Sequence, residues 1–313
     1  MSYAVGTLSP ETSTGNESYT GVGFAPQFII FTASLSVNDT NSNAGGGTMC
    51  GIAVSSSSRA VVGGSGTSGA GTSDEWGWSD SALPIKWQQT KATTRFAADL
   101  VSMDADGFTL NWTTAGAGGY ETVDITYQAF GGFDNVSLDQ FTSPTGVDDN
   151  TTITPGFQAD LLFIIGGFTT GTGAQTRNSQ SVSVGAGTST SSQWCINGLA
   201  EDGQGTSDTD TILRVDQICN NGYNSLDFIK GHIEDITSTT YVIDWDAVWG
   251  AGNVYFWGLA VKGGTWDVGV DTVQTSAATK AHSTSNSPDA VFIGSTAVTS
   301  TNTYTADCQV GYG

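Results

Sequence analysis

Basic residues are scarce in this chain. Its 313 residues include only 9 Lys and Arg against 30 Asp and Glu, which gives a formal net charge of −21. Nucleic acids and anionic membrane surfaces are bound through clusters of basic side chains, because these neutralise phosphate charge. We therefore expect no nucleic acid and no membrane among the partners, and an acidic, strongly hydrated exterior.

Long apolar runs are also missing. The longest, residues 161–165, has the length of a strand, whereas a membrane-spanning helix needs about 20 apolar residues. Residues 1–5 contain neither the basic region nor the apolar stretch of a signal peptide. The sequence thus predicts no membrane span and no export signal, so we expect a protein that is made in a cytoplasm and leaves it, if at all, by lysis or assembly.

Histidine is nearly absent. The two histidines, His232 and His282, have no second His close in sequence, so neither a His-based catalytic triad nor a multi-His metal site is expected. Each is interpreted as an exposed or hydrogen-bonded structural residue. Glycine clusters such as residues 63–72 are not followed by Lys and Ser or Thr, so they predict turns rather than a phosphate-binding loop.

What the chain does have is internal repetition. Residues 23–30 return at 156–163 and, in outline, at 287–293, while residues 108–112 return at 241–245. A step of about 130 residues is typical of duplicated domains, because solenoid repeats fall at about 20–50 residues. The sequence predicts a first repeat over 1–132, a second over 133–264 and a partial third over 265–313.

The predicted fold class is all-β, with tandem jelly-roll-like or lectin-like β-sandwich domains of about eight strands and a C-terminal half-repeat. Apolar and polar residues alternate over 108–112 and 241–245, as expected for half-buried strands. Asp106 and Gly107 predict a tight turn before the first of these. Residues 28–31 and 161–164 are apolar on both faces and should be central strands. Short helical turns are expected near 90–100 and 212–219.

The four cysteines predict no disulfide framework. Cys50, Cys195 and Cys308 are interpreted as one buried core position filled three times, once in each repeat. Cys219 has no such counterpart in the repeats. A bond between Cys195 and Cys219 inside the second repeat is the alternative.

The third repeat stops after about half its length and is predicted to be an assembly element. It supplies an opening strand around Val268, Val270 and Val273, a strand around Val291 and Phe292, and the stretch around Cys308. Half a sandwich cannot cover its own apolar face or satisfy its sheet edges. We therefore expect it to dock on a repeat of this chain, on another subunit or on a different protein. The candidate assembly residues are Val268, Val270, Val291 and Phe292.

Carboxylates offer the main candidates for chemistry. A glycosidase needs two acids about 5–10 Å apart across a cleft, and the closest pairs are Asp104 with Asp106, Asp148 with Asp149, and Asp244 with Asp246. The first two pairs are expected in turns and the third at outward positions of a strand. We therefore expect no catalytic residues and no enzymatic activity.

Calcium is a second hypothesis for the acidic loops. Hard oxygen ligands gather at Asp202, Asp208 and Asp210 on a Gly-rich loop, and at Asp104 and Asp106. Neither set completes a twelve-residue EF-hand loop, so solvated acidic loops without a cofactor are the preferred interpretation. Calcium remains the alternative.

Aromatic residues could bind carbohydrate instead. Trp76 and Trp78 follow two acidic residues on a polar stretch, and Trp249 follows Asp246 and two small apolar residues. Exposed rings in such places stack on sugar faces, so these three residues are candidates for contact with a glycan or a partner. Packing within the loops is the competing interpretation.

Residues 14–31, 100–112 and 127–132 together resemble a β-rich repeat of tailed-virus (phage or archaeal virus) virion structural proteins. The resemblance covers the first repeat best, the second well and the third only in its first strands. The second repeat departs from it where Thr239 and Thr240 replace the Asp–Gly turn. The resemblance implies a non-enzymatic particle component with no catalytic residues.

These features lead to two functional hypotheses. The first is a virion surface protein, made in the host cytoplasm, that serves as a capsid decoration, turret or spike subunit, forms a homo-oligomer and contacts other virion proteins. The alternative is a receptor-binding tail fibre or baseplate protein with a lectin-like site for a host-surface glycan.

Overall fold

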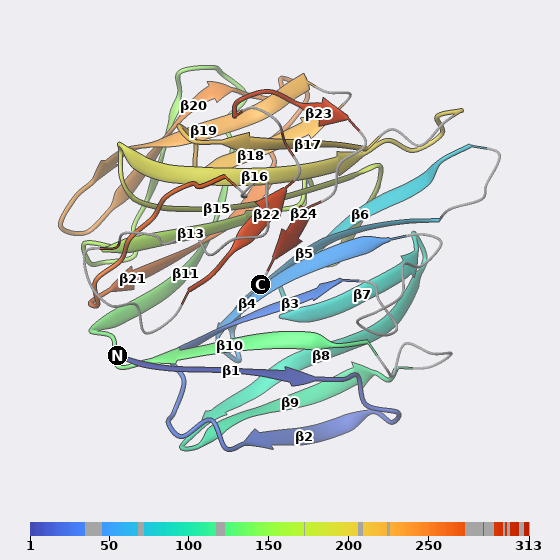
Figure 1. Cartoon of the computed structure of the whole chain (residues 1–313), viewed down its shortest axis with the longest axis vertical. Coiled ribbons are helices and arrows are strands. Elements are labelled where there is room, and N and C mark those ends of the chain that lie inside the picture. The colour runs from blue at the N-terminus through green and yellow to red at the C-terminus, as the bar shows by residue number, and fades with distance from the viewer. Residues whose placement is uncertain are drawn as a thin grey trace.

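The computed structural model describes residues 1–34, 46–67, 72–116, 123–171, 173–205, 209–223, 226–272, 284, 291–296, 298, 301–306 and 310–312. These residues form strands joined by turns and contain no helix (Figure 1). The all-β prediction is therefore confirmed, whereas the helical turns expected near 90–100 and 212–219 are wrong, because strands run through or into both stretches. The described part of the chain also has no helix of the length and apolarity needed to cross a membrane.

The first half of the chain forms a sandwich of a long and a short antiparallel sheet. The long sheet has the order β1 (Ser2–Leu8), β10 (Ile125–Gly131), β3 (Phe28–Ser34), β4 (Gly47–Ser55), β5 (Ser58–Thr67) and β6 (Asp74–Asp80). The short sheet has the order β2 (Gly15–Thr20), β9 (Gly107–Thr114), β8 (Thr93–Asp104) and β7 (Ile85–Thr90). Phe108, Leu110 and Trp112 on β9 are buried between the sheets while Thr109 and Asn111 face outward, as the alternation predicts.

The second half forms a sandwich with the same strand order. Its long sheet runs β11 (Asn135–Thr142), β21 (Tyr255–Lys262), β13 (Leu161–Gly166), β15 (Gln180–Ser189), β16 (Ser192–Ala200) and β17 (Thr209–Arg214). Its short sheet runs β12 (Asn150–Ile153), β20 (Tyr241–Ala247), β19 (Leu226–Ile236) and β18 (Cys219–Tyr223). Among the described residues each sandwich therefore has ten strands of its own, whereas about eight were expected.

Four further strands join these units. β14 (Gln175–Asn178) follows β13 in sequence but pairs with β6 of the first sandwich. β23 (Thr305–Ala306) pairs with β17 of the second. β22 (Gly294–Thr296) and β24 (Val310–Tyr312) pair with each other. Because β6 and β17 hold the same place in their sheets, each long sheet is extended at the same edge by a strand from later in the chain.

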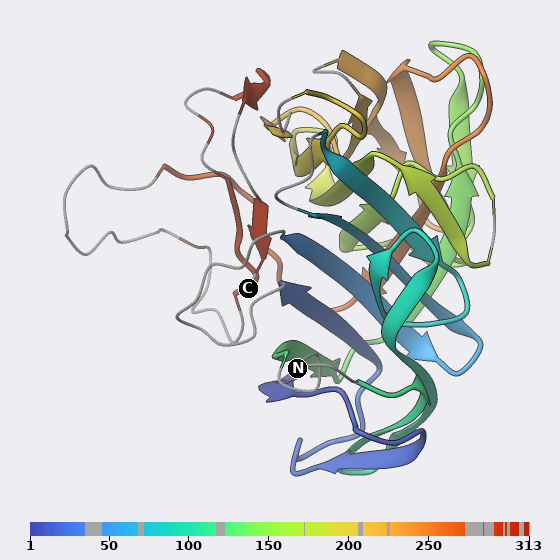
Figure 2. The same cartoon turned by 90° about the vertical axis from the view of Figure 1, so that its right-hand side faces the viewer.

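The outer faces of the two long sheets share a third core. Phe28 and Ile30 of the first sheet belong to one buried cluster with Phe163 and Ile165 of the second. The two-stranded sheet of β22 and β24 contacts β16, β17 and β3, so it touches both sandwiches. Figures 1 and 2 show it between the two sandwiches and on one side of both. The two sandwiches therefore share a packed interface and are not independent domains joined only by a linker.

The expectation that Cys50 and Cys195 fill one repeated core position is wrong, and the alternative of a Cys195–Cys219 bond is excluded. Cys50 lies on β4, opposite Thr32, whereas Cys195 lies on β16, opposite Gly185. Since β4 corresponds to β15 and not to β16, the two residues fill different buried positions. Cys195 and Cys219 are both buried and are not joined by a disulfide. Cys308 lies outside the described residues.

The opening strand expected around Val268 and Val270 is also wrong, because residues 263–272 contain no strand. The strand expected around Val291 and Phe292 begins only after them, at Gly294 of β22. Trp266 and Val268 instead pack as irregular chain against the shared core. Val273 lies outside the described residues.

Candidate functional site: the joint between the sandwiches

We call the contact between the two sandwiches around β6 and β14 the joint. Its first component is backbone pairing between these two strands. Gln175 lies opposite Ser79, and Asn178 opposite Trp76. Ser179 then turns the chain back with a φ of 65°, and its N–H donates to the Glu75 carbonyl at 2.9 Å. A strand from the second sandwich thereby satisfies the edge of the first, which is the geometry of β-augmentation.

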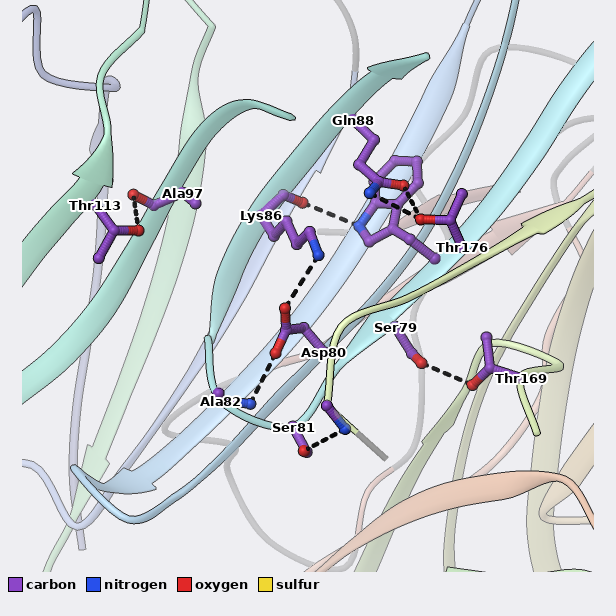
Figure 3. Close-up of polar contacts among 12 residues, drawn as sticks. Ser79, Asp80, Ser81, Ala82, Lys86, Gln88, Ala97, Thr113, Thr169 and Thr176 are labelled. Carbon is purple, nitrogen blue, oxygen red and sulfur yellow. Dashed lines mark hydrogen bonds and ion pairs between the residues drawn. The ribbon is translucent and has the colours of Figure 1, made fainter. Parts of the chain in front are cut away.

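Polar side chains fix the register of this pairing (Figure 3). The Ser79 and Thr169 hydroxyls lie 2.6 Å apart and are buried. The Gln88 amide donates to the Thr176 hydroxyl oxygen at 2.9 Å. These pairs join the first sandwich to the second. Because each buried polar group loses its water on docking, a slipped register would leave them unpaired.

A buried ion pair lies beside these contacts. Lys86 Nζ lies 3.0 Å from Asp80 Oδ2, and the two side chains are only 6% and 5% exposed (Figure 3). The Ala82 N–H donates to the other Asp80 oxygen at 2.9 Å. A buried pair adds little net stability but penalises any arrangement that separates its charges. The Lys86–Asp80 pair therefore fixes the conformation of the β6–β7 connection, which packs next to the second sandwich.

The other end of the joint is acidic. Lys91 Nζ lies 2.7 Å from Asp202 of the second sandwich and 3.6 Å from Asp74 of the first. The Glu75 N–H donates to Asp202 Oδ1 at 3.3 Å. Burial, reinforced by the charges of Asp74 and Asp202, raises the pKa of the Glu75 carboxyl to about 7. The joint thus contains a carboxyl that titrates near neutral pH.

The half-repeat presents two different faces. Phe292 is half-buried and meets Phe163 edge to face, with ring centroids 5.2 Å apart. Its neighbours Val291 and Ile293 are 58% and 60% exposed. In the sequence repeat these two positions correspond to Leu162 and Ile164, which are fully buried beneath the short sheet of the second sandwich. The half-repeat therefore docks on its own chain through one face and leaves an apolar face uncovered.

The other assembly candidates divide in the same way. Val268 is half-buried against the shared core, and its carbonyl accepts a hydrogen bond from Ser192 Oγ at 3.0 Å. Val270 is 41% exposed. Val268 and Phe292 thus attach the half-repeat to its own chain, whereas Val270 and Val291 are available to a partner.

Comparison with known proteins gives no relative from which a function could be taken. No family model, curated protein or solved structure matches this chain. The function has to be argued from the residues of this chain alone.

The carbohydrate prediction for Trp76 and Trp78 is wrong. Both rings are buried in the first sandwich, at 1% and 0% exposure, and their indole N–H groups donate to the carbonyls of Gln88 and Lys86. The stretch forms β6, so alternate residues face inward and both tryptophans enter the core. A ring inside a core cannot stack on a sugar.

Trp249 keeps some exposed surface, but one face of its ring is occupied. The Arg177 guanidinium lies 4.8 Å from the Trp249 ring centroid and 4.4 Å from that of Phe168. Arg177 belongs to β14, so this stacking contributes to the joint. Trp249 is the only one of the three candidate rings that a sugar could reach.

The acidic residues considered for calcium have other roles. Asp202 pairs with Lys91, and Asp210 is buried on β17. Asp104 accepts hydrogen bonds from Ser102 and Thr109. Asp106 accepts from the N–H groups of Gly21 and Gly23, which ties the β8–β9 turn to the loop after β2.

Asp208 lies outside the described residues. Within the described part, none of these aspartates joins a group of three possible ligand atoms close enough to share one ion. The calcium hypothesis gains no support from the described aspartates.

Proposed function

We infer that this protein is a non-enzymatic structural subunit of a tailed-virus virion surface, of the decoration, turret or spike class. The observation that carries this proposal is the half-repeat, which docks on its own chain through Phe292 and exposes Val291 and Ile293 on its other face. In each sandwich the corresponding apolar face is covered by a second sheet. Val291 and Ile293 lie just before β22 in chain without regular secondary structure, and their exposed apolar side chains form a docking surface.

A second copy of this chain is the proposed occupant of that face. The face is small and apolar, so two copies can bury it against each other about a two-fold axis, residue against the same residue. Within each sandwich a second sheet covers the positions that correspond to Val291 and Ile293. Homo-oligomerisation through the half-repeat gives these two residues a cover from another chain.

The surface of the described residues favours a structural role over catalysis. One depression has a volume of about 540 Å³ and is open to solvent. Among the residues that line it, Asp134 is the only acid, and no His or Cys is present. Hydrolysis by paired carboxylates needs two acids that face each other, and this depression offers one.

Light scattering on the double variant Val291→Asp/Ile293→Asp tests the proposal. The intact chain is expected to be a defined oligomer and the variant a folded monomer, because two buried carboxylates per chain would oppose the contact. Val5→Asp is the matched control, since Val5 is also 58% exposed but lies on β1. A monomeric intact chain, or an oligomer that survives the double substitution, would overturn the proposed contact.

Attachment to a particle is tested separately. The intact chain is expected to bind virus heads or tails that lack it, in a stoichiometry that follows the particle symmetry. Cleavage of a glycan or peptide by the purified protein would contradict the non-enzymatic assignment.

A further inference from the structure

His232 lies among three carboxylates on the outer face of the short sheet of the second sandwich. His232 on β19 is directly opposite Asp244 on β20, and Asp246 lies two residues further along β20. Glu234 is two residues after His232 on β19 and is exposed, so it lies on the same face. Because side chains alternate along a strand, all four groups project toward solvent on the same face.

The imidazole is oriented by one of these carboxylates. His232 Nδ1 lies 2.9 Å from Asp246 Oδ2, a hydrogen-bonding distance. With Nδ1 donating to Asp246, the lone pair of Nε2 faces the other two acids. A carboxylate on the far nitrogen of a histidine fixes its tautomer and strengthens it as a metal ligand. Asp246 also accepts a hydrogen bond from Gln217, which holds it in place.

The remaining distances suit a shared cation better than hydrogen bonds. His232 Nε2 lies 3.6 Å from Glu234 Oε2 and 3.8 Å from Asp244 Oδ2, too far for good hydrogen bonds. The three ligand atoms all lie within 4.8 Å of one another. Tetrahedral zinc, with bonds of about 2.1 Å, separates its ligands by about 3.4 Å. Small side-chain movements would close the group around such an ion.

At the equivalent place in the first sandwich a carboxylate is paired with an arginine, which the second sandwich lacks. There Asp99 on β8 lies opposite Asn111, as His232 lies opposite Asp244. Arg59 Nη2 donates to Asp99 Oδ2 at 2.9 Å, so the chain itself supplies the positive charge. Arg59 is the second residue of β5, and Gln193 is the second residue of β16.

The second sandwich therefore has more carboxylates at this place and no corresponding arginine. The positive charge of Lys230 favours the ionised form of Asp246, the carboxylate that orients His232. One oxygen of Asp244, Oδ1, is buried and has no hydrogen-bond partner. A bound cation would supply the missing charge.

We propose that His232, Glu234 and Asp244 bind one divalent transition-metal cation of the zinc type, with Asp246 as a positioning residue. One imidazole with two carboxylates favours zinc or a similar metal over calcium, whose ligands are oxygen alone. Three protein ligands on an exposed face leave a coordination position open to water or to a group from a partner.

Titration of the full chain with zinc chloride, followed by calorimetry, tests the site. One zinc per chain is expected to bind, and excess calcium is expected not to displace it. His232→Ala should weaken binding at least about 100-fold, and Asp246→Asn about 10- to 100-fold, the usual range for loss of an orienting carboxylate. Unfolding midpoints measured without metal should match those of the intact chain, because all four side chains reach solvent.

Glu234→Gln and Asp235→Asn form the matched pair. Both remove one exposed negative charge from neighbouring positions on β19, but only Glu234 belongs to the group. Glu234→Gln is expected to weaken zinc binding at least about 10-fold and Asp235→Asn to leave it unchanged. Equal effects would mean diffuse attraction to an acidic surface and would overturn the site, as would unchanged binding in His232→Ala.

Discussion

Glu75 makes the stability of the joint depend on pH. Burial, with the charges of Asp74 and Asp202, raises the pKa of its carboxyl from 4.5 to about 7 in the folded protein. Between these two values the folded chain holds a proton that the unfolded chain has lost, so stability falls as pH rises through this window. Above about pH 7 both states are ionised at this group and its contribution no longer changes.

Glu75→Gln should remove this dependence. Because the side chain is partly exposed, the ionised form of Glu75 is expected to cost only about 1–2 kcal/mol. The variant should be more stable than the intact chain at pH 8 by that amount, and equally stable at pH 4.5. Denaturant unfolding across this range measures the difference. Glu17→Gln, an exposed acid on β2, is the control, and parallel curves for the two variants would contradict the prediction.

Single residues were the hardest features to predict from the sequence. His232 looked isolated because its neighbours Asp244 and Asp246 come from the next strand, and only the register of β19 and β20 brings them together. The available signal was the alternation of polar residues on two successive strands.

The burial of the Trp78 ring could not be predicted from the sequence for a related reason. A Cβ added at Gly63 would lie 2.3 Å from the Trp78 ring, so this glycine leaves space for the indole and is not part of a flexible loop. Glycine in a strand can mark a close approach of another group. The sequence shows the glycine but not the ring that fills its place.

At the scale of strands, prediction succeeded where the signal is local. The buried residues of β9 and β20 alternate in sequence as they do in the sheets, and the two-residue turn before Gly107 joins β8 to β9 as expected. β14 and β23 could not be predicted in this way. They are short and polar, and each becomes a strand only by pairing with an edge that is distant in sequence.

Two glycines in central strands should tolerate no side chain. A Cβ on Gly51 of β4 would lie 1.8 Å from the Pro84 carbonyl oxygen, and one on Gly185 of β15 would lie 1.9 Å from that of Ile218. Both obstacles are backbone atoms in the connections that lead from the long sheet to the short one, so no side-chain rotation relieves the clash. Gly51→Ala and Gly185→Ala should each lower the free energy of unfolding by about 3 kcal/mol or more.

Denaturant unfolding against Gly250→Ala checks this expectation. A Cβ on Gly250 would meet nothing within 4 Å, so this control should unfold like the intact chain. Gly51→Ala or Gly185→Ala with the stability of the control would show that the connections can move away from the strands.

At the scale of the whole molecule, three units meet around one core. Ile30, Phe163 and Phe292 hold the same place in the three sequence repeats, and all three pack in or against the shared cluster. The two sandwiches bury large parts of their long sheets there, whereas the half-repeat contributes the small sheet of β22 and β24 and a short irregular stretch. The half-repeat should therefore be the least stable of the three attachments, because it buries the least apolar surface.

Phe292→Ala tests this order of stability. Loss of the half-buried ring should cost about 1–3 kcal/mol locally, so hydrogen exchange at residues 294–296 and 310–312 should accelerate about 5- to 150-fold. Exchange in β13 and β21 should not change, since their hydrogen bonds belong to the second sandwich. Val291→Ala, which alters an exposed neighbour, is the control in a dilute sample.

Equal acceleration in β13 would mean that the half-repeat and the second sandwich open as one unit. Protection that rises with protein concentration in the intact chain, but not in Val291→Asp/Ile293→Asp, would place the contact between chains next to the sheet of β22 and β24. Exchange in this one sheet thus separates attachment within the chain, which depends on Phe292, from attachment between chains, which depends on Val291 and Ile293.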